Sequence, residues 1–304
     1  MRKIVYILSL TTLLSASYAT VKTPAIEKRS GDPEILTLDA RIDYDAPEKT
    51  PEQKEAEQLR KLIMAASSGN VQAQYELGNR LANGDKYGRD PNPQQAVYWW
   101  QKAASMGHAG AQCSLAILYH TGELLPHNQH KAAELWKSAA ELGDVDAMFY
   151  IGVCYANGLG VMRDPVLAYQ WWVKAAERGN ERAQVNIGFC YARGEGVKKD
   201  ISVAVKIWQK AAENGNTSAQ CMLANCYYTG DGVKADPKKA VAIWTAAAEK
   251  GDAESMYYLA NCYKEGAGGL SMDLDKFKYW IKRAAQNGNA QAKKILQANP
   301  AINQ

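Results

Sequence analysis

Cysteine and histidine are the residues of this sequence best suited to metal binding, redox chemistry or nucleophilic catalysis. The 304 residues include six cysteines, and all four histidines fall in one stretch: His108, His120, His127 and His130. Clustered histidines can bind a transition metal. However, His108 begins a sequence unit, and His127 and His130 flank a loop and a helix start. We therefore predict solvated or capping histidines and no metal, with metal storage as the alternative.

The cysteines occupy equivalent places along the chain. Four of them recur every 36 residues: Cys154, Cys190, Cys226 and Cys262. Equivalent residues of stacked helices lie roughly 8–10 Å apart, whereas a disulfide needs Cα atoms within ~7 Å. We therefore expect mostly free, buried thiols that pack as small hydrophobic side chains.

Motifs of established catalytic sites are missing from the sequence. It has no GxSxG, no HExxH and no Walker-type loop. Its GxG sequences follow expected helices rather than strands, so they are explained as turn glycines rather than phosphate-binding loops. We predict no enzyme activity and no cofactor; a hydrolase built from residues of several units is the alternative.

A repeat of about 36 residues organises the elements that carry these residues. Its clearest marker is a glycine, at Gly107, Gly143, Gly179, Gly215 and Gly251. Six full units cover 69–287, between a capping helix at 51–68 and a capping helix and tail at 288–304. A single unit cannot bury its own apolar faces, so units must stack. The fold class is therefore all-α, a solenoid of about six helix–turn–helix repeats with terminal half repeats.

Each unit contains the signals of two helices. The first helix begins at an Asn or Asp cap, at Asn70, Asp144, Asn180, Asn216, Asp252 and Asn289. A Gly-containing loop ends it, and the second helix often begins with a cap followed by Pro. One small-residue position recurs in the first helix, where we expect two helices to approach closely: Gly78, Ala116, Gly152, Gly188, Ala224 and Ala260. A Trp recurs in the second helix and is expected to wedge between units: Trp100, Trp136, Trp172, Trp208 and Trp244.

These positions resemble the Sel-one-like repeat family, a relative of the tetratricopeptide repeats. The pattern A-x3-LG-x2-Y, GxGV and D-x3-A-x3-W-x2-AA recurs from Gly69 to Gln286. Departures are Leu81 in the first unit and Phe277 and Ile281 in the last. The resemblance implies a right-handed α/α superhelix whose first helices line a concave groove, and it implies protein binding.

The first helices suggest where such a partner would bind. Counting from the leading Ala as place one, places one, five, eight and nine form the core face, so places three, seven and ten are expected to be exposed in the groove. Several are apolar, which is typical of an interaction site. The predicted partner-binding residues are Cys113, Ile117, Phe149, Val153, Val185, Phe189, Asn225, Tyr228, Tyr257 and Asn261. Tight curling of the superhelix, or the N-terminal segment folding back, is the alternative that would cover this face.

The N-terminus has the features of an export signal. Arg2 and Lys3 precede an apolar stretch from Ile4 to Leu14, and Ser17-Tyr18-Ala19 offers a cleavage site, so we predict a signal peptide over 1–19. Residues 20–50 are polar with three prolines and are predicted to be a flexible segment. Without Arg2 and Lys3, 34 basic and 32 acidic residues remain. This near-neutral balance lacks the excess of basic residues that is typical of nucleic-acid-binding proteins.

Together these features predict an exported, monomeric protein that is not inserted in a membrane after cleavage. Its expected location is the periplasm, or alternatively outside the cell. What the family resemblance implies is a protein-binding regulator or immunity-type inhibitor, or alternatively a secreted factor that acts on host cells.

Overall fold

The computed structural model describes residues 50–84, 90–299 and 302, and its regular elements in these ranges are helical. The predicted signal peptide, and the flexible segment apart from Thr50, lie outside the described residues. Fourteen α-helices follow one another: α2 (Pro51–Ser67), α3 (Val71–Asn83), α4 (Pro93–Ser105), α5 (Ala109–Thr121), α6 (Gln129–Glu141), α7 (Val145–Asn157), α8 (Pro165–Glu177), α9 (Glu181–Arg193), α10 (Ile201–Glu213), α11 (Thr217–Thr229), α12 (Pro237–Glu249), α13 (Ala253–Glu265), α14 (Leu274–Gln286) and α15 (Ala290–Ala298).

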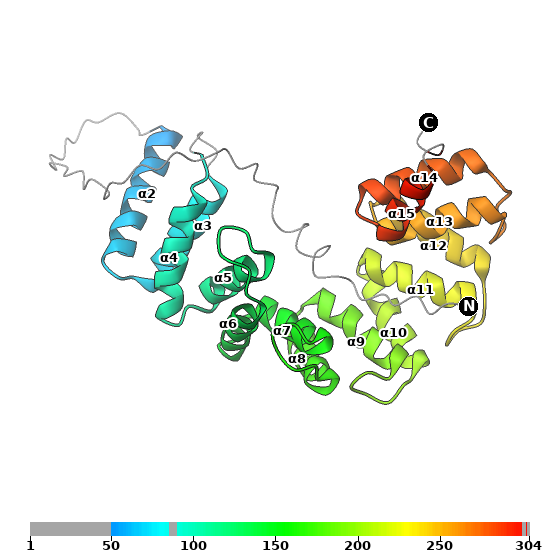
Figure 1. The fold of residues 1–304 in the computed structure, drawn as a ribbon, viewed down its shortest axis with the longest axis horizontal. Helices are drawn as coiled ribbons and strands as arrows, with labels where there is room; N and C mark the ends of the chain where they lie inside the picture. Colours follow the sequence, from blue (N-terminus) through cyan, green and yellow to red (C-terminus); the bar gives the residue numbers. More distant parts are fainter. Residues whose placement is uncertain (1–49, 85–89, 300–301, 303–304) are drawn as a thin grey trace.

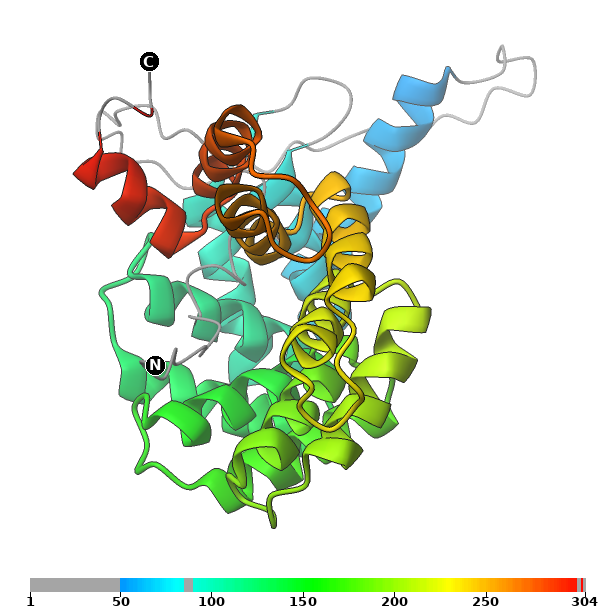
Figure 2. The ribbon, with the colours of Figure 1, turned by 90° about the vertical axis from the view of Figure 1, so that its right-hand side faces the viewer.

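The helices stack in chain order into a solenoid, which confirms the predicted fold class. Each helix packs against the helix before it and the helix after it. The array bends into an arch in which α5, α7 and α9 lie on the inner side of α6, α8 and α10 (Figure 1). Turned by 90°, it coils, with the C-terminal helices in front of the N-terminal ones (Figure 2). Within the described ranges, no helix is both long and apolar enough to cross a bilayer.

Local side-chain chemistry fixes where the helices begin and end. All six predicted Asn and Asp caps accept a backbone N–H of the first turn. At α7, for example, Asp144 Oδ1 accepts from the Ala147 N–H at 2.7 Å. The same helix ends at Gly158, whose φ of 71° is the left-handed conformation that glycine adopts most readily. Each unit therefore sets its own boundaries.

The close helix approach predicted at the small-residue position is confirmed where that residue is glycine, because there the Trp of the unit's second helix packs against it. A Cβ on Gly152 would lie 2.6 Å from the Trp172 ring, and a Cβ on Gly188 would overlap Trp208. This close approach lets the indole N–H reach the backbone. Trp172 Nε1 donates to the Phe149 carbonyl at 3.2 Å.

In two units with alanine at this position, the indole N–H has a different environment. In the unit of Ala116 the Trp136 N–H has no hydrogen-bond partner among the described residues, and it lies beside the Cys113 thiol. Trp244 and Cys221 repeat this arrangement three units further along the chain. Glycine at 152 and 188 therefore accompanies an indole bonded to a backbone carbonyl, and alanine at 116 and 224 accompanies an indole beside sulfur.

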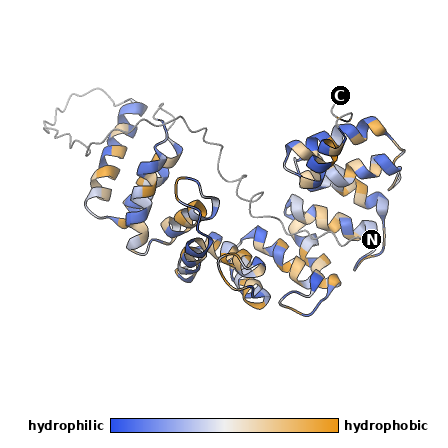
Figure 3. Ribbon diagram, viewed as in Figure 1, coloured by the Kyte–Doolittle hydropathy of each residue, from blue (hydrophilic) through white to orange (hydrophobic). Residues whose placement is uncertain are grey.

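Contacts between units use the indoles of Trp136 and Trp244. Trp136 stacks on Tyr150 of the next unit with ring centroids 5.1 Å apart, which confirms its predicted wedging position. The loops add a second contact, since the second glycine of a GxG loop packs on the first turn of the preceding unit's second helix, as Gly160 does on Gln129. Each helix faces several neighbours. Hydrophobic and hydrophilic residues therefore alternate along the ribbon (Figure 3).

At the small-residue position, we expect a substitution that favours helix formation to destabilise the protein. We expect Gly188→Ala to lower the free energy of unfolding by about 1–3 kcal/mol, because the added methyl overlaps Trp208. Helix propensity alone would favour alanine by about 1 kcal/mol. Urea unfolding monitored by circular dichroism measures the difference.

A double-mutant cycle supplies the control for this prediction. Adding Val185→Cys to Gly188→Ala reproduces the Cys113 and Ala116 combination, so the pair should cost less than the sum of the single changes. A Gly188→Ala protein as stable as the wild type would contradict the assigned packing.

Candidate partner-binding surface

The row of first helices (α3, α5, α7, α9, α11 and α13) carries the ten residues predicted to bind a partner. The structure divides them into two groups. Four are buried, with exposed fractions of 7% or less: Cys113, Phe149, Val153 and Val185. Six are half-buried and reach the surface: Ile117, Phe189, Asn225, Tyr228, Tyr257 and Asn261. The expectation that places three, seven and ten are exposed is therefore wrong for the first group, and also for Cys221 and His120.

Helix α7 shows why the expectation failed. Every residue from Ala147 to Cys154 is buried, including Phe149 at 0% exposure. One side of α7 packs on its own second helix, another on the preceding unit's Trp136, and Arg182 of α9 covers Phe149 at 4.5 Å. The tight curling that we considered as an alternative thus accounts for the apolar residues in the middle of this row.

An ionic contact closes this part of the row. Arg182 donates from Nη2 to Asp146 Oδ1 at 2.6 Å and from Nη1 to the Tyr150 hydroxyl at 3.2 Å. Asn180 donates to the same carboxylate oxygen at 3.3 Å. Because these polar groups are satisfied within the chain, the contact joins two units and leaves little free for a ligand.

The C-terminal half of the row remains accessible. We call its five half-buried residues the inner strip: Phe189 on α9, Asn225 and Tyr228 on α11, and Tyr257 and Asn261 on α13. Helices α11 and α13 touch directly. The inner strip therefore combines residues of adjacent units on neighbouring helices.

Packing holds the aromatic rings of the inner strip in place. The edge of Phe189 meets Trp208 at 5.3 Å, and Tyr228 lies 5.3 Å from Trp244. Arg193 also lies over the Phe189 ring at 5.2 Å. Rings fixed in this way lose little conformational entropy when a ligand covers them.

The polar groups of the inner strip, by contrast, form no hydrogen bonds with other described residues. Among the described residues, the side-chain amides of Asn225 and Asn261 and the hydroxyls of Tyr228 and Tyr257 have no hydrogen-bond partner. Each amide offers donors and an acceptor, and each hydroxyl offers both. The strip can thus bind a partly apolar segment and hydrogen-bond its polar groups.

The cysteines do not form a reactive site. All six are free and buried, which confirms the prediction for the four that recur every 36 residues and corrects the expected exposure of Cys113 and Cys221. Burial raises the pKa of Cys154 and Cys190 to about 12 and that of Cys226 and Cys262 to about 11. Because the thiolate is the nucleophile, these thiols are suited to packing rather than to catalysis or metal binding.

Two histidines have the structural roles that the sequence left open. His108 caps α5, with its Nδ1 accepting from the Ala111 N–H at 3.2 Å. His120 is buried at the last turn of α5 and bonds Gln129 through Nδ1 at 2.9 Å. Among the described residues, no three His, Cys, Asp or Glu side chains are grouped to hold a metal ion.

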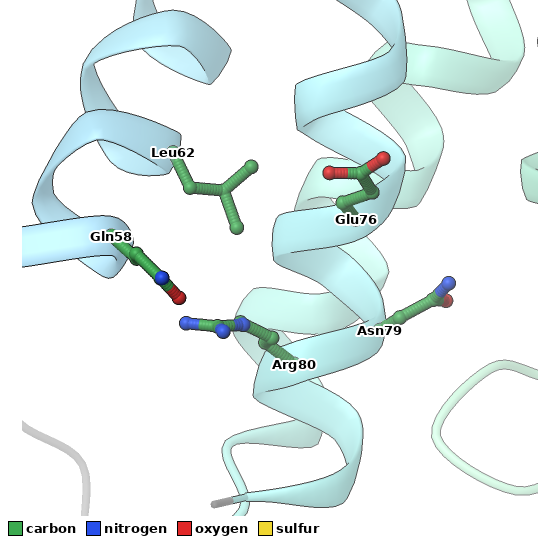
Figure 4. Close-up of a pocket in the computed structure, with 5 residues that line it drawn as sticks. All are labelled: Gln58, Leu62, Glu76, Asn79 and Arg80. Carbon is green, nitrogen blue, oxygen red and sulfur yellow. The ribbon is translucent and has the colours of Figure 1, made fainter. Parts of the chain in front are cut away.

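A shallow cleft lies at the other end of the array, between α2 and α3 (Figure 4). Arg80 points toward Gln58 of α2, whereas Asn79 points away from α2. Both side chains have a partner inside the chain, although Arg80 Nη1 is buried without one among the described residues. Arg80 pairs with Glu55 at 2.5 Å, and Asn79 Oδ1 accepts from Trp100 Nε1 at 3.0 Å. We therefore place the candidate surface at the inner strip.

Family comparison agrees with the repeat seen in the structure. The Sel1 repeat model matches six consecutive segments, 71–108, 109–144, 145–180, 181–216, 217–252 and 253–289. The chain belongs to the Sel1 repeat family. Proteins of this family generally mediate protein–protein interactions and are generally non-enzymatic scaffolds.

Solved structures include similar Sel1 repeat proteins. A Sel1 repeat protein from Oxalobacter formigenes is 31% identical, with a TM-score of 0.69 over 77% of this chain and 94% of that chain. The protein c5321, a protective antigen present in uropathogenic Escherichia coli strains and displaying an SLR fold, is also 31% identical, with a TM-score of 0.63 over 79% of this chain. The match spans 51%, about half, of the length of c5321. No curated protein sequence matches the chain.

Burial predicts losses of stability of different size for two phenylalanines that the sequence analysis had placed on the same exposed face. Phe149→Ala should lower the free energy of unfolding by about 3–5 kcal/mol, because it empties a fully enclosed site. Phe189→Ala is the matched control and should cost distinctly less, because its ring is partly exposed. Urea unfolding of both variants makes the comparison. Equal losses would contradict the division between buried and accessible residues.

Proposed function

We propose that this protein is an exported binding module that captures a segment of a partner protein on the inner strip. One observation carries the proposal: anchored aromatic rings and unused hydrogen-bonding groups lie together on α9, α11 and α13. Tyr and Trp side chains with this combination of apolar body and polar tip are enriched at sites that dominate binding energy.

The inner strip suits an extended peptide segment better than a flat protein surface. Asn225 and Asn261 occupy equivalent places of neighbouring helices, so their amides recur at the spacing of the units. Side-chain amides can pair with the N–H and C=O groups that an extended backbone leaves free. The rings of Tyr228 and Tyr257 lie on the same two helices and would cover the segment's side chains.

Export into the periplasm is the proposed setting. Its support comes from Arg2, Lys3 and the Ser17-Tyr18-Ala19 sequence, which match a cleavable signal. In this setting the protein would act as a regulator or immunity-type inhibitor that holds its partner in a stoichiometric complex. A host-facing, secreted role is the second candidate, favoured by the 31% identity to a protein described as a protective antigen.

The inner strip predicts a specific loss of binding. A partner captured from cell-envelope extract and identified by mass spectrometry should bind the Tyr228→Ala/Asn261→Ala protein at least about 30-fold more weakly. This corresponds to about 2 kcal/mol, typical for truncation of a central aromatic residue. Isothermal titration calorimetry measures the affinity, and circular dichroism verifies the fold.

Tyr98→Ala provides the control on the second helix α4, where the ring is 49% exposed. We expect wild-type affinity from this variant. A folded inner-strip variant that retains wild-type affinity would move the binding surface elsewhere on the protein.

Export predicts a defined mature N-terminus. Protein purified from its native host should have the intact mass of a chain that begins at Thr20, because cleavage is expected after Ala19. Cell fractionation should recover it with the periplasm or the medium. Full-length protein in the cytoplasm would refute this part of the proposal, while leaving the binding test unaffected.

A further inference from the structure

One helix of the array carries a histidine at each end. The four histidines of the sequence all belong to the second unit, and two of them, His108 and His120, lie at the start and in the last turn of α5. Every other first helix begins at Asn or Asp. The second unit thus differs from the rest in a residue that titrates near neutral pH.

Hydrogen bonds define the protonation state of His108. Its Nδ1 accepts the Ala111 N–H at 3.2 Å, so this nitrogen carries no proton. Its Nε2 lies 2.9 Å from Gln72 Oε1 on α3, and since an amide oxygen only accepts, Nε2 donates. The ring also stacks on Tyr75 of α3 at 4.3 Å. The neutral imidazole thus caps α5 and joins the first unit to the second.

Protonation would undo this arrangement. A proton on Nδ1 would face the Ala111 N–H, which would remove the cap, and the positive charge would sit at the positive end of the helix dipole. Burial lowers the pKa of His108, while the carboxylates that face it, Glu76 on α3 and Asp144 at the start of α7, act in the opposite direction. The balance favours the neutral ring.

His120 adds a second buried imidazole to the same helix. It is 9% exposed, lies 5.6 Å from the Trp136 ring and bonds Gln129 through Nδ1. Burial lowers its pKa, and nearby His127 lowers it further, whereas the bond to Gln129 raises it. Both ends of α5 are therefore packed around imidazole rings whose pKa is lowered by burial.

We infer that α5 is an acid-sensitive joint: protonation of His108 loosens the second unit from the first, and protonation of His120 loosens α5 from α6 within the second unit. For a histidine favoured in its neutral form when folded, the stabilisation is complete above the ordinary histidine pKa and is lost as the pH falls. Units capped by asparagine have no such dependence, because the amide does not titrate. The joint therefore makes one place in the array respond to acid, independently of any partner.

Amide hydrogen exchange tests this joint directly. Between pH 7.5 and 5.0, the protection factor of the Ala111 amide, corrected for the intrinsic exchange rate, should fall by about fivefold, the factor expected for loss of a side-chain cap. The amides of Ala183 and Ala219 serve as internal controls because Asn180 and Asn216 cap their helices. They should keep their protection.

The variant His108→Asn installs the cap of the other units and should keep Ala111 protected at both pH values. Adding His120→Ala, the residue type of the equivalent Ala156 and Ala192, should remove what remains of the acid-induced fall in the urea midpoint. Equal acid responses at Ala111 and Ala183, or an unchanged response in His108→Asn, would overturn the inference.

Titration of the His108 ring by NMR decides the question even if the variants fold poorly. A midpoint below 6.5 supports the joint. A midpoint above 6.5 would show that the folded protein prefers the charged ring, and would overturn it.

Discussion

The array depends on one contact, an indole packed against a residue with almost no side chain. That contact sets how closely the two helices of a unit approach, and indoles such as Trp136 also stack on the next unit, here on Tyr150. The curvature of the stack and the burial of its inner row both follow from this spacing. Where glycine is replaced by alanine, as at Ala116 and Ala224, a cysteine lies beside the indole N–H instead.

Features that depend on chemistry within a unit could be predicted from the sequence. An Asn or Asp before an apolar helix offers an oxygen to free N–H groups, so caps such as Asn180 were correctly predicted. A close helix approach at Gly188 could be predicted in the same way, because a small residue recurs at this place, but its contact with Trp208 was found only in the structure. Burial of Cys154, Cys190, Cys226 and Cys262 could also be predicted, since they share the core side of the first helix, whereas burial of Cys113 and Cys221 could not.

Features that depend on the stacking of units were harder to predict. A helical wheel assigns one side to the core, whereas α7 is enclosed by its own second helix, by Trp136 and by Arg182. Phe149 was therefore placed on a surface that the neighbouring unit covers. The accessible part of the row, which includes Asn225 and Asn261, could be recognised only once the positions of adjacent helices were known.

The six enclosed thiols make the timing of folding important. In the folded protein, burial raises their pKa and keeps them from reagents. In the proposed exported setting, the same thiols are exposed during passage through a membrane, and an oxidising compartment promotes disulfides between whichever cysteines meet. Under that proposal, chain collapse must outpace oxidation. Contacts in this array are largely between helices adjacent in sequence, an arrangement that favours rapid folding and would hide each sulfur soon after its unit emerges.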